Sequence, residues 1–310
     1  MSAETATKAG FAAVIGAPNA GKSTLVNRLV GRKVSIVTHK VQTTRFQVRG
    51  VMMRGDAQVV LVDTPGVFAP RRRLDRAMVK SAWEGANDAD AVVHVVDAAG
   101  EIGSKPADKR GQEDVRRVID GLKASDAKAI LALNKIDLIR RAELLAIAER
   151  LHGEGVYDSV FMISAETGDR VEDLAAELVS RMPDGPFFYD PDQVADLPER
   201  LLAAEITREK LFLRVHEELP YETTVETEGW TEKKDGSVRI EQIVYVSREG
   251  HKPIVLGKNG RTIKDIGQKA RAELEAELGR TVHLFLHVGV RPKWGEERAR
   301  YAALGLDFDV

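Results

Sequence analysis

Two glycines, a lysine and a serine near the start of the chain stand at a spacing suited to binding phosphate groups. They lie in the stretch Gly16–Ser23, between an apolar run at Phe11–Ile15 and a helical run at Thr24–Leu29. Glycine leaves room for backbone amides to curl around a polyphosphate, and the N-terminus of the following helix would face the anion. Lys22 would then reach the β and γ phosphates, and the hydroxyl of Ser23 would coordinate Mg²⁺. The predicted phosphate-binding residues are Gly16, Ala17, Pro18, Asn19, Ala20, Gly21, Lys22, Ser23 and Thr24.

A carboxylate and a glycine follow a second apolar run, Gln58–Val62, in the string Asp63-Thr64-Pro65-Gly66. Asp63 could hold the metal ion through a water molecule, and the Gly66 amide could meet a γ-phosphate. The string by itself is common and would also fit a simple turn after a strand. Its position at a strand end favours a binding role, because open α/β sheets bind ligands there.

Polar residues after two further apolar runs, Ala129–Leu133 and Val160–Ile163, could recognise a purine base. A carboxylate at Asp137 can accept hydrogen bonds from guanine N1–H and the 2-amino group, neither of which adenine offers. Asn134 could reach the opposite base edge, and the Ala165 amide could donate to guanine O6. Such pairing discriminates strongly because the wrong base leaves buried groups unpaired; an isolated N-K-x-D string would also fit a surface turn. The predicted guanine-binding residues are Asn134, Lys135, Asp137, Ser164, Ala165 and Glu166.

These motifs need a scaffold that brings several strand ends together, and residues 11–182 have the pattern of one. Short β-branched runs alternate with longer helical stretches, which is typical of a parallel sheet wrapped by helices. The runs are continuously apolar, as buried parallel strands should be, and Phe46–Met53 is expected to be an edge strand. We therefore predict an α/β domain at residues 9–182, with a mostly parallel sheet and helices on both faces. The longest expected helices are Leu74–Glu84, Asp108–Leu122, Ala142–Leu151 and Val171–Met182.

The composition of the 310 residues supports a globular chain of two domains, with 43% hydrophobic and 30% charged residues. Lys and Arg number 46 against 48 Asp and Glu, so any nucleic-acid surface must be local. The absence of cysteine excludes disulfides, thiolate catalysis and cysteine-based metal sites. Neither a membrane span nor a secretory signal is visible in the sequence, so we expect a cytoplasmic protein.

A proline-rich segment at residues 183–198 precedes a region with a different order of elements. A helix near Glu199–Glu217, strands near Thr223–Thr231 and Val238–Ser247, a further helix and a strand near Val282–Val288 predict an α+β domain. The expected organisation is a disordered start at 1–8, the first domain at 9–182, a linker at 183–198, a second domain at 199–300 and a tail at 301–310.

Two glycines of the second region, Gly257 and Gly260, lie between helical stretches and resemble the G-x-x-G loop of KH domains. In that fold the loop lies against the sugar-phosphate backbone of a few nucleotides, and the expected order of elements resembles the type II KH arrangement. From Arg248 to Arg271 there are seven Lys and Arg against two acidic residues, an excess that would also fit a solvated helix face. The predicted RNA-binding residues are Gly257, Lys258, Asn259, Gly260, Arg261 and Lys264.

Together these motifs resemble those of the Era family, in the translation-factor-like class of P-loop GTPases. The resemblance covers Phe11–Leu306 and is closest at Thr38–Arg45, which is similar to the first switch of that family. It implies that Thr44 reaches Mg²⁺ when GTP is bound, with Thr43 as the alternative, and that Ser23 and, through water, Asp63 complete the metal site. The implied switch residues are Gln42, Thr43, Thr44 and Arg45 in the first switch, and Asp63, Thr64, Pro65, Gly66 and Val67 in the second.

The resemblance also implies an activity and partners. Members of the family hydrolyse GTP to GDP and phosphate, bind the 3′ end of small-subunit (16S) ribosomal RNA, and assist assembly of the 30S subunit from the pre-30S particle. The nucleotide would switch this association by ordering the two switches. We expect a monomer, and a weak peripheral contact with the inner membrane stays open. Two other interpretations are an RNA-binding module with a purely structural nucleotide site, and a GTPase of another branch with a protein partner.

Val67 stands where many GTPases have the glutamine that orients the attacking water. A valine cannot orient water, so we expect slow intrinsic hydrolysis; the substitution is usual among Era-like proteins. Asn19 stands where some relatives hold potassium, which leaves a requirement for K⁺ open. Arg71, Arg72 and Arg73 follow the second switch and fit either an RNA or partner contact or a solvated run.

Overall fold

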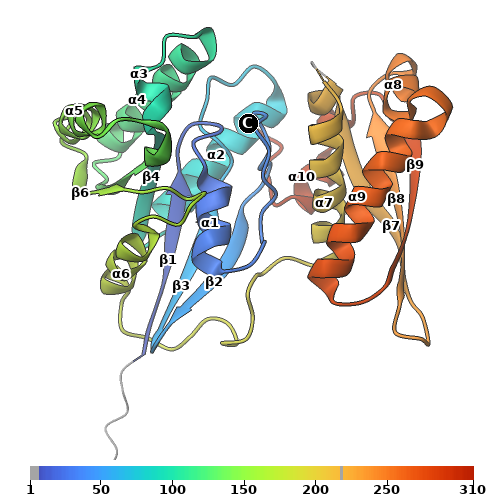
Figure 1. Ribbon diagram of the computed structural model, residues 1–310, viewed down its shortest axis with the longest axis horizontal. Coiled ribbons are helices and arrows are strands. Elements are labelled where there is room, and N and C mark those ends of the chain that lie inside the picture. Colours follow the sequence, from blue (N-terminus) through green and yellow to red (C-terminus); the bar gives the residue numbers. More distant parts are fainter. Residues whose placement is uncertain (1–6, 217–218) are drawn as a thin grey trace, which may run out of the picture. The chain divides into compact units, whose positions relative to one another are not determined.

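The computed structural model describes residues 7–216 and 219–310, which form two compact units (Figure 1). The first unit contains the described chain up to Asp196 together with Tyr301–Val310, and the second contains Leu197–Arg300. Of the expected disordered start, residues 1–6 lie outside the described residues. Lys8 belongs to the first strand instead, because its amide donates to the carbonyl of Asp56 at 3.0 Å.

The first unit is built on a six-stranded sheet with the order β2-β3-β1-β4-β5-β6. The edge strand β2 is antiparallel to β3 and every other neighbouring pair is parallel, which confirms the predicted mostly parallel sheet. Strands β3 and β5 are buried along their whole length, as their continuous apolar runs predict. The strands are β1 (Lys8–Ile15), β2 (Val48–Arg54), β3 (Ala57–Asp63), β4 (Ala91–Asp97), β5 (Ala129–Asn134) and β6 (Tyr157–Met162).

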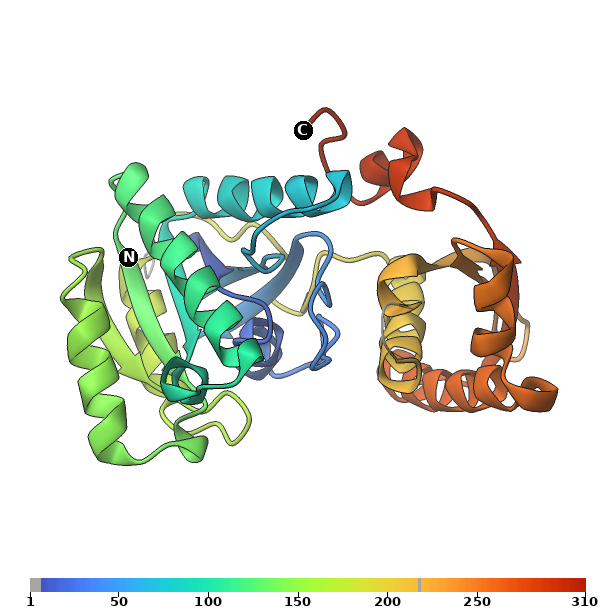
Figure 2. The same cartoon turned by 90° about the horizontal axis from the view of Figure 1, so that it is seen from above.

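Helices cover both faces of this sheet (Figure 2). On one face α2, α4 and α5 enclose a core that includes Ile15 and Leu133, while α1 and α6 contact each other on the opposite face. The sequence pattern does not predict the five-residue α3, which is too short to show a helical period; Asp97 caps it by accepting the Gly100 amide at 3.0 Å. The helices are α1 (Lys22–Val30), α2 (Arg73–Asn87), α3 (Ala98–Ile102), α4 (Pro106–Ala124), α5 (Arg141–His152) and α6 (Val171–Arg181).

The proline-rich segment, residues 183–198, is predicted to be a linker between the domains, and in the structure most of it belongs to the first unit. The side chain of Gln58, buried in β3, accepts the amide of Tyr189 at 3.0 Å. Val51 of the edge strand β2 donates its amide to the carbonyl of Val194 at 2.9 Å. The segment thus supplies hydrogen-bond partners to a strand edge that would otherwise be open.

Residues 301–310 depart from the expected separate tail, because they pack on α2 of the first unit. Tyr301 and Leu306 are buried in an apolar cluster with Met78. The guanidinium of Arg73 lies 4.3 Å from the centroid of the Phe308 ring, so this member of the arginine run has a partner within the chain. Burial of apolar side chains against α2 accounts for the departure. The segment begins within the last helix, α10 (Arg298–Ala303).

The second unit packs two long helices, α7 and α9, on a three-stranded sheet. Strand β7 is antiparallel to β8, and β8 is parallel to β9. This is the expected α+β order of a KH domain; the first helix ends at Arg214, and its expected end, Glu217, lies outside the described residues. The main elements are α7 (Glu199–Arg214), β7 (Thr223–Glu232), β8 (Val238–Val246), α8 (Lys252–Leu256), α9 (Arg261–Leu278) and β9 (Val282–Val290).

Candidate functional site

The phosphate loop, residues 16–23, joins the carboxyl end of β1 to α1. Its backbone turns at Gly21, whose φ of 96° is left-handed, and a Cβ there would lie 2.2 Å from the Nδ2 atom of Asn134. The loop meets the second switch, residues 63–67, through the Val67 amide, which donates to the carbonyl of Gly16 at 3.0 Å. Conformation and space therefore both require glycine at position 21.

Lys22 is buried at the base of this loop, with 6% of its surface exposed. Its Nζ donates to the carbonyls of Gly16 and Ala17 at 3.1 and 2.9 Å. Burial lowers the pKa of Lys22 to about 8, although the nearby carboxylate of Asp63 opposes the change. A cation so poorly solvated gains more from a bound anion than an exposed one would.

Oxygen atoms of the three predicted metal ligands lie together beside Lys22. The Ser23 hydroxyl donates to Oδ2 of Asp63 at 2.7 Å and lies 3.0 Å from the hydroxyl of Thr44. The second oxygen of Asp63 is buried without a hydrogen-bond partner in the described part of the chain, and burial raises the pKa of this carboxyl group. Hydroxyl and carboxylate oxygens are the ligands that Mg²⁺ prefers, so the cluster fits that ion.

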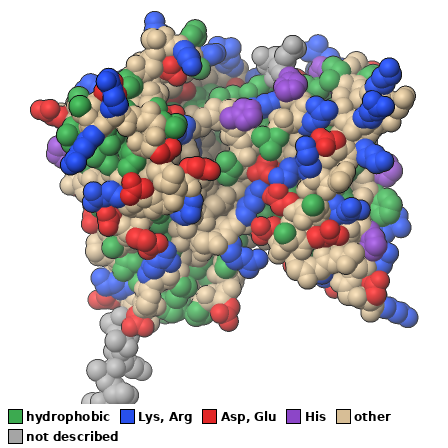
Figure 3. Space-filling model, in the orientation of Figure 1, with side chains coloured by type: hydrophobic (Ala, Val, Ile, Leu, Met, Phe, Trp, Pro, Cys, Tyr) green, Lys and Arg blue, Asp and Glu red, His purple; other side chains and the backbone are tan. Residues whose placement is uncertain are grey.

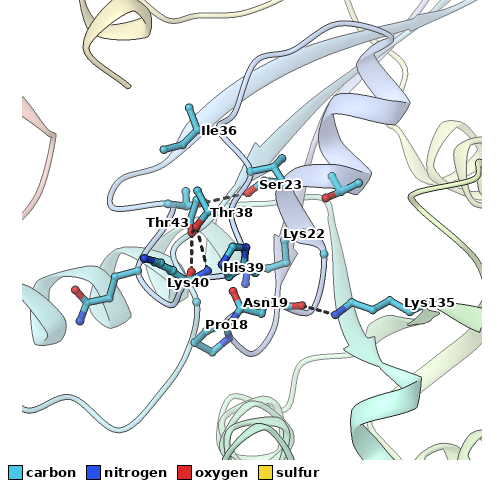
Figure 4. A pocket seen from close by; sticks show the side chains of 16 residues that line it. Pro18, Asn19, Lys22, Ser23, Ile36, Thr38, His39, Lys40, Thr43 and Lys135 are labelled. Atoms are coloured by element: carbon cyan, nitrogen blue, oxygen red, sulfur yellow. Dashed lines mark hydrogen bonds between the residues drawn. The ribbon is translucent and has the colours of Figure 1, made fainter. Parts of the chain in front are cut away.

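The first switch, residues 42–45, presents Thr44 rather than Thr43 to this cluster. The Thr43 hydroxyl donates to the carbonyl of Lys40 and pairs with the Thr38 hydroxyl, both at 2.6 Å. A cavity of ≈ 250 Å³ opens between this part of the chain and the phosphate loop (Figure 4). The geometry therefore separates the two threonines: Thr44 faces the other predicted metal ligands, and Thr43 bonds within its own segment.

The predicted guanine-binding residues lie at or after the ends of β5 and β6, and two groups among them bond within the protein. Asn134 donates from Nδ2 to the carbonyl of Ala20 at 2.8 Å, and its Oδ1 accepts the amide of Ala165 at 2.9 Å. These groups brace two loops against each other, since buried polar groups must pair; their contacts with a base stay a prediction. Asp137 is exposed and accessible to a ligand.

Asp97 and Arg28 belong to the same region, although no motif indicates them. The Lys135 Nζ donates to the carbonyl of Asn19 at 2.8 Å and to Oδ2 of Asp97 at 2.5 Å. Arg28 donates to the carbonyl of Ala165 at 3.2 Å. The position of Asp97 at the end of a buried strand is a signal that could have found it, whereas Arg28 lies within a helix without any such signal.

The remaining predicted residues of the first unit fix the shape of the site. Val67 is 3% exposed and packs into the core, so its side chain does not reach the cavity. The Thr64 hydroxyl donates to the carbonyl of Val14 at 2.8 Å and ties the second switch to β1. The structure also buries Ala17, Ala20, Arg45, Pro65, Gly66 and Ser164, and leaves Pro18, Thr24 and Glu166 at least partly exposed.

The predicted RNA loop, residues 257–260, joins α8 to α9 in the second unit. Gly257 and Gly260 have left-handed φ values of 72° and 74°. Lys and Arg side chains are spread over the visible face of this unit, including the end that carries α8 (Figure 3). The glycine backbone and the positively charged side chains of the loop are therefore accessible to a ligand. The structure exposes the other predicted residues, Lys258, Asn259, Arg261 and Lys264.

Neither a cluster of metal-binding side chains nor a membrane-spanning helix occurs within residues 7–216 and 219–310. No group of three or more His, Cys, Asp or Glu side chains is placed to hold a metal ion. None of the described helices has the length and apolarity needed to cross a membrane.

Comparison with known proteins identifies both units. A family model described as a 50S ribosome-binding GTPase matches residues 11–135, and a KH domain model matches residues 218–295. The chain is 64% identical to the GTPase Era of Caulobacter vibrioides, with 98% of each chain covered. It is 59% identical to the GTPase Era of Maricaulis maris, with 99% of each chain covered.

Two solved structures share the fold over 96% of this chain and 99% of their own. One is Era in complex with MgGDPNP and nucleotides 1506-1542 of 16S ribosomal RNA, with a TM-score of 0.87 at 35% identity. The other is a variant of Aquifex aeolicus Era bound to GDP and AlF4⁻, with a TM-score of 0.85 at 34% identity. With both domain models matched and identity above one half along the full length, the chain belongs to the Era family of GTPases.

Proposed function

We propose that this GTPase binds the 3′ end of small-subunit ribosomal RNA and assists maturation of the 30S subunit, with the bound nucleotide switching the association. The observation that carries the proposal is the likeness, over 96% of the chain, to the Era that was solved with MgGDPNP and 16S ribosomal RNA. The exposed cations around the RNA loop support it, because KH domains hold single-stranded RNA through such a loop.

The phosphate loop and both switches would hold GTP. Lys22 would contact the β and γ phosphates, while Ser23 and Thr44 would coordinate Mg²⁺ and Asp63 would hold it through water. Bound Mg²⁺ neutralises charge on the phosphate oxygens. The exposed Asp137 would accept two hydrogen bonds from guanine and so select against adenine.

Loss of the γ-phosphate would release both switches. Thr44 would contact that phosphate through Mg²⁺, and the Gly66 amide would contact it directly, so both contacts would be lost together. Since the Val67 side chain is buried, another group would position the attacking water, and intrinsic hydrolysis would be slow. The exposed Asn19 in the phosphate loop supports a potassium ion beside the phosphates.

The proposed setting is the cytoplasm, with the protein acting as a monomer on the pre-30S particle. This setting is where ribosomal RNA is available to the RNA loop. A weak peripheral contact with the inner membrane is compatible with this role, but the role does not require it.

The decisive experiment measures affinity for a single-stranded fragment of the small-subunit rRNA 3′ end in three states: with a GTP analogue, with GDP and without nucleotide. A scrambled fragment of equal length is the matched control. We expect tight binding that depends on sequence and is strongest with the GTP analogue. Binding indifferent to both nucleotide and sequence would rule out the proposed switch and direct attention to a protein partner.

A further inference from the structure

Asp75, near the start of α2, contacts the first switch and the residues that follow the second switch through its two carboxylate oxygens. Its Oδ2 accepts the amides of Arg71 and Arg72, at 3.0 and 2.9 Å, just after the second switch. Its Oδ1 accepts the side-chain amide of Gln42, in the first switch, at 2.9 Å. With 4% of its surface exposed, this carboxylate is screened little by water.

Gln42 has a backbone conformation that needs support. Its φ of 58° is left-handed, which costs free energy in a residue with a Cβ. Farther along the segment, Gln47 donates from Nε2 to the carbonyl of Ser81 in α2 at 2.7 Å. Thr44, which faces the metal ligands, lies between these two attachments to α2.

We propose that Asp75 is a positioning residue that links the first switch to the start of α2, just after the second switch, and holds Thr44 in the arrangement that binds the metal ion. One oxygen holds the start of α2 and the other holds the first switch, so the two move as one unit while both bonds persist. The inference rests on the proposed nucleotide site, and it adds a residue that belongs to no nucleotide-binding motif of the chain.

A purely structural role for Asp75 is the competing explanation, because the residue also caps α2. The chain contains a matched control for that role. Asp108 occupies the same position in α4 and accepts the amide of Lys105 at 2.9 Å, and among the described residues it makes no bond to either switch. A helix-capping effect would therefore appear in both variants, and a switch effect only at Asp75.

The experiment measures dissociation constants for fluorescent GDP and for a non-hydrolysable GTP analogue, together with kcat and KM. The variants are Gln42→Ala, Asp75→Ala, their double variant and Asp108→Ala. We expect Gln42→Ala and Asp75→Ala each to weaken the GTP analogue by about tenfold while GDP changes by less than about twofold, since the lost bond is charge-assisted. The double variant should lose little more than either alone.

Asp108→Ala should lower the unfolding temperature as Asp75→Ala does, without changing the ratio of the two affinities. An unchanged ratio in Gln42→Ala overturns the inference, as does an equal change in Asp108→Ala. Gln42→Ala leaves the cap intact, so the test stands even where Asp75→Ala does not fold. Lys22→Ala tests the proposed nucleotide site separately from the role of Asp75. If Lys22→Ala still binds both nucleotides, the proposed site is wrong. If only the affinity ratio of Gln42→Ala is unchanged, the role of Asp75 alone is ruled out.

Discussion

The two glycine loops of this protein differ in what holds their shape. In the phosphate loop, a Cβ at Gly21 would meet Asn134, which belongs to a distant strand. In the RNA loop, a Cβ at Gly257 would lie 2.1 Å from the hydroxyl of its near neighbour Thr262, and one at Gly260 would have no atom within 4 Å. A loop braced by other strands presents fixed amides to one compact ligand. A loop that contacts only neighbouring residues of the chain leaves one side open to the sugar-phosphate backbone of an RNA ligand.

The comparison is tested most strongly by separate substitutions of the two RNA-loop glycines. Gly257→Ala should destabilise the second unit by about 2–4 kcal/mol, because a left-handed φ and a collision with Thr262 add together. Gly260→Ala should cost about 1 kcal/mol, from conformation alone, and should weaken RNA binding in a folded protein. Urea unfolding followed by tryptophan fluorescence, to which Trp230 in β7 contributes, measures the difference. Equal destabilisation by the two variants would contradict the contrast within this loop.

Replacement of potassium by sodium should affect the two loops differently, by changing GTP hydrolysis at the phosphate loop and leaving RNA binding at the RNA loop unchanged. If Asn19 helps to hold potassium, kcat for GTP should fall by about tenfold when sodium replaces potassium at constant ionic strength, about 1.4 kcal/mol in barrier height. RNA affinity should not change between the two salts, because phosphate contacts of the RNA loop depend on ionic strength and not on the cation. Asn19→Ala should remove the difference in kcat. Equal hydrolysis rates in sodium and potassium with the natural chain would exclude the ion.

A smaller effect concerns Asp114 in α4, a partly buried carboxylate, whereas the charged side chains of the RNA loop are exposed. Burial raises the pKa of Asp114 to about 6, although Arg117 opposes the change. Because the folded pKa exceeds that of the unfolded chain, the charged form disfavours folding, and the contribution to stability should increase as the pH falls from about 7 through 6 toward 4. Asp114→Asn should therefore stabilise the first unit by about 1 kcal/mol at pH 8 and by less at pH 5.

The control for that measurement is Asp120→Asn, which changes an exposed carboxylate of the same helix. Urea unfolding at both pH values, with each variant compared to the natural chain, isolates the contribution of Asp114. A gain of the same size at pH 5 and pH 8 in Asp114→Asn would show that the titration of Asp114 is not its source.

The strands and their polar ends could be predicted because both are local patterns. Strand β5 is a continuous apolar run that ends at Asn134, and a buried parallel strand needs no more than that to be visible. Asp75 has no such signal, because its role depends on a contact with Gln42, 33 residues earlier. The bonds of Asn134 were beyond prediction for the same reason: its type indicated a polar site, but its partners come from loops that only the folded sheet brings together.

The docking of residues 301–310 on α2 also determines how the protein would respond to proteolysis. The chain leaves the first unit after Asp196 and returns to it at Tyr301, so two covalent crossings join the units. A single cut near Asp196 leaves the second unit attached to a segment anchored by the buried Tyr301 and Leu306. Release of a free KH fragment therefore requires a second cut or dissociation of that cluster. A shortened protein that ends before Tyr301 would instead expose Met78, and with it an apolar surface that favours aggregation.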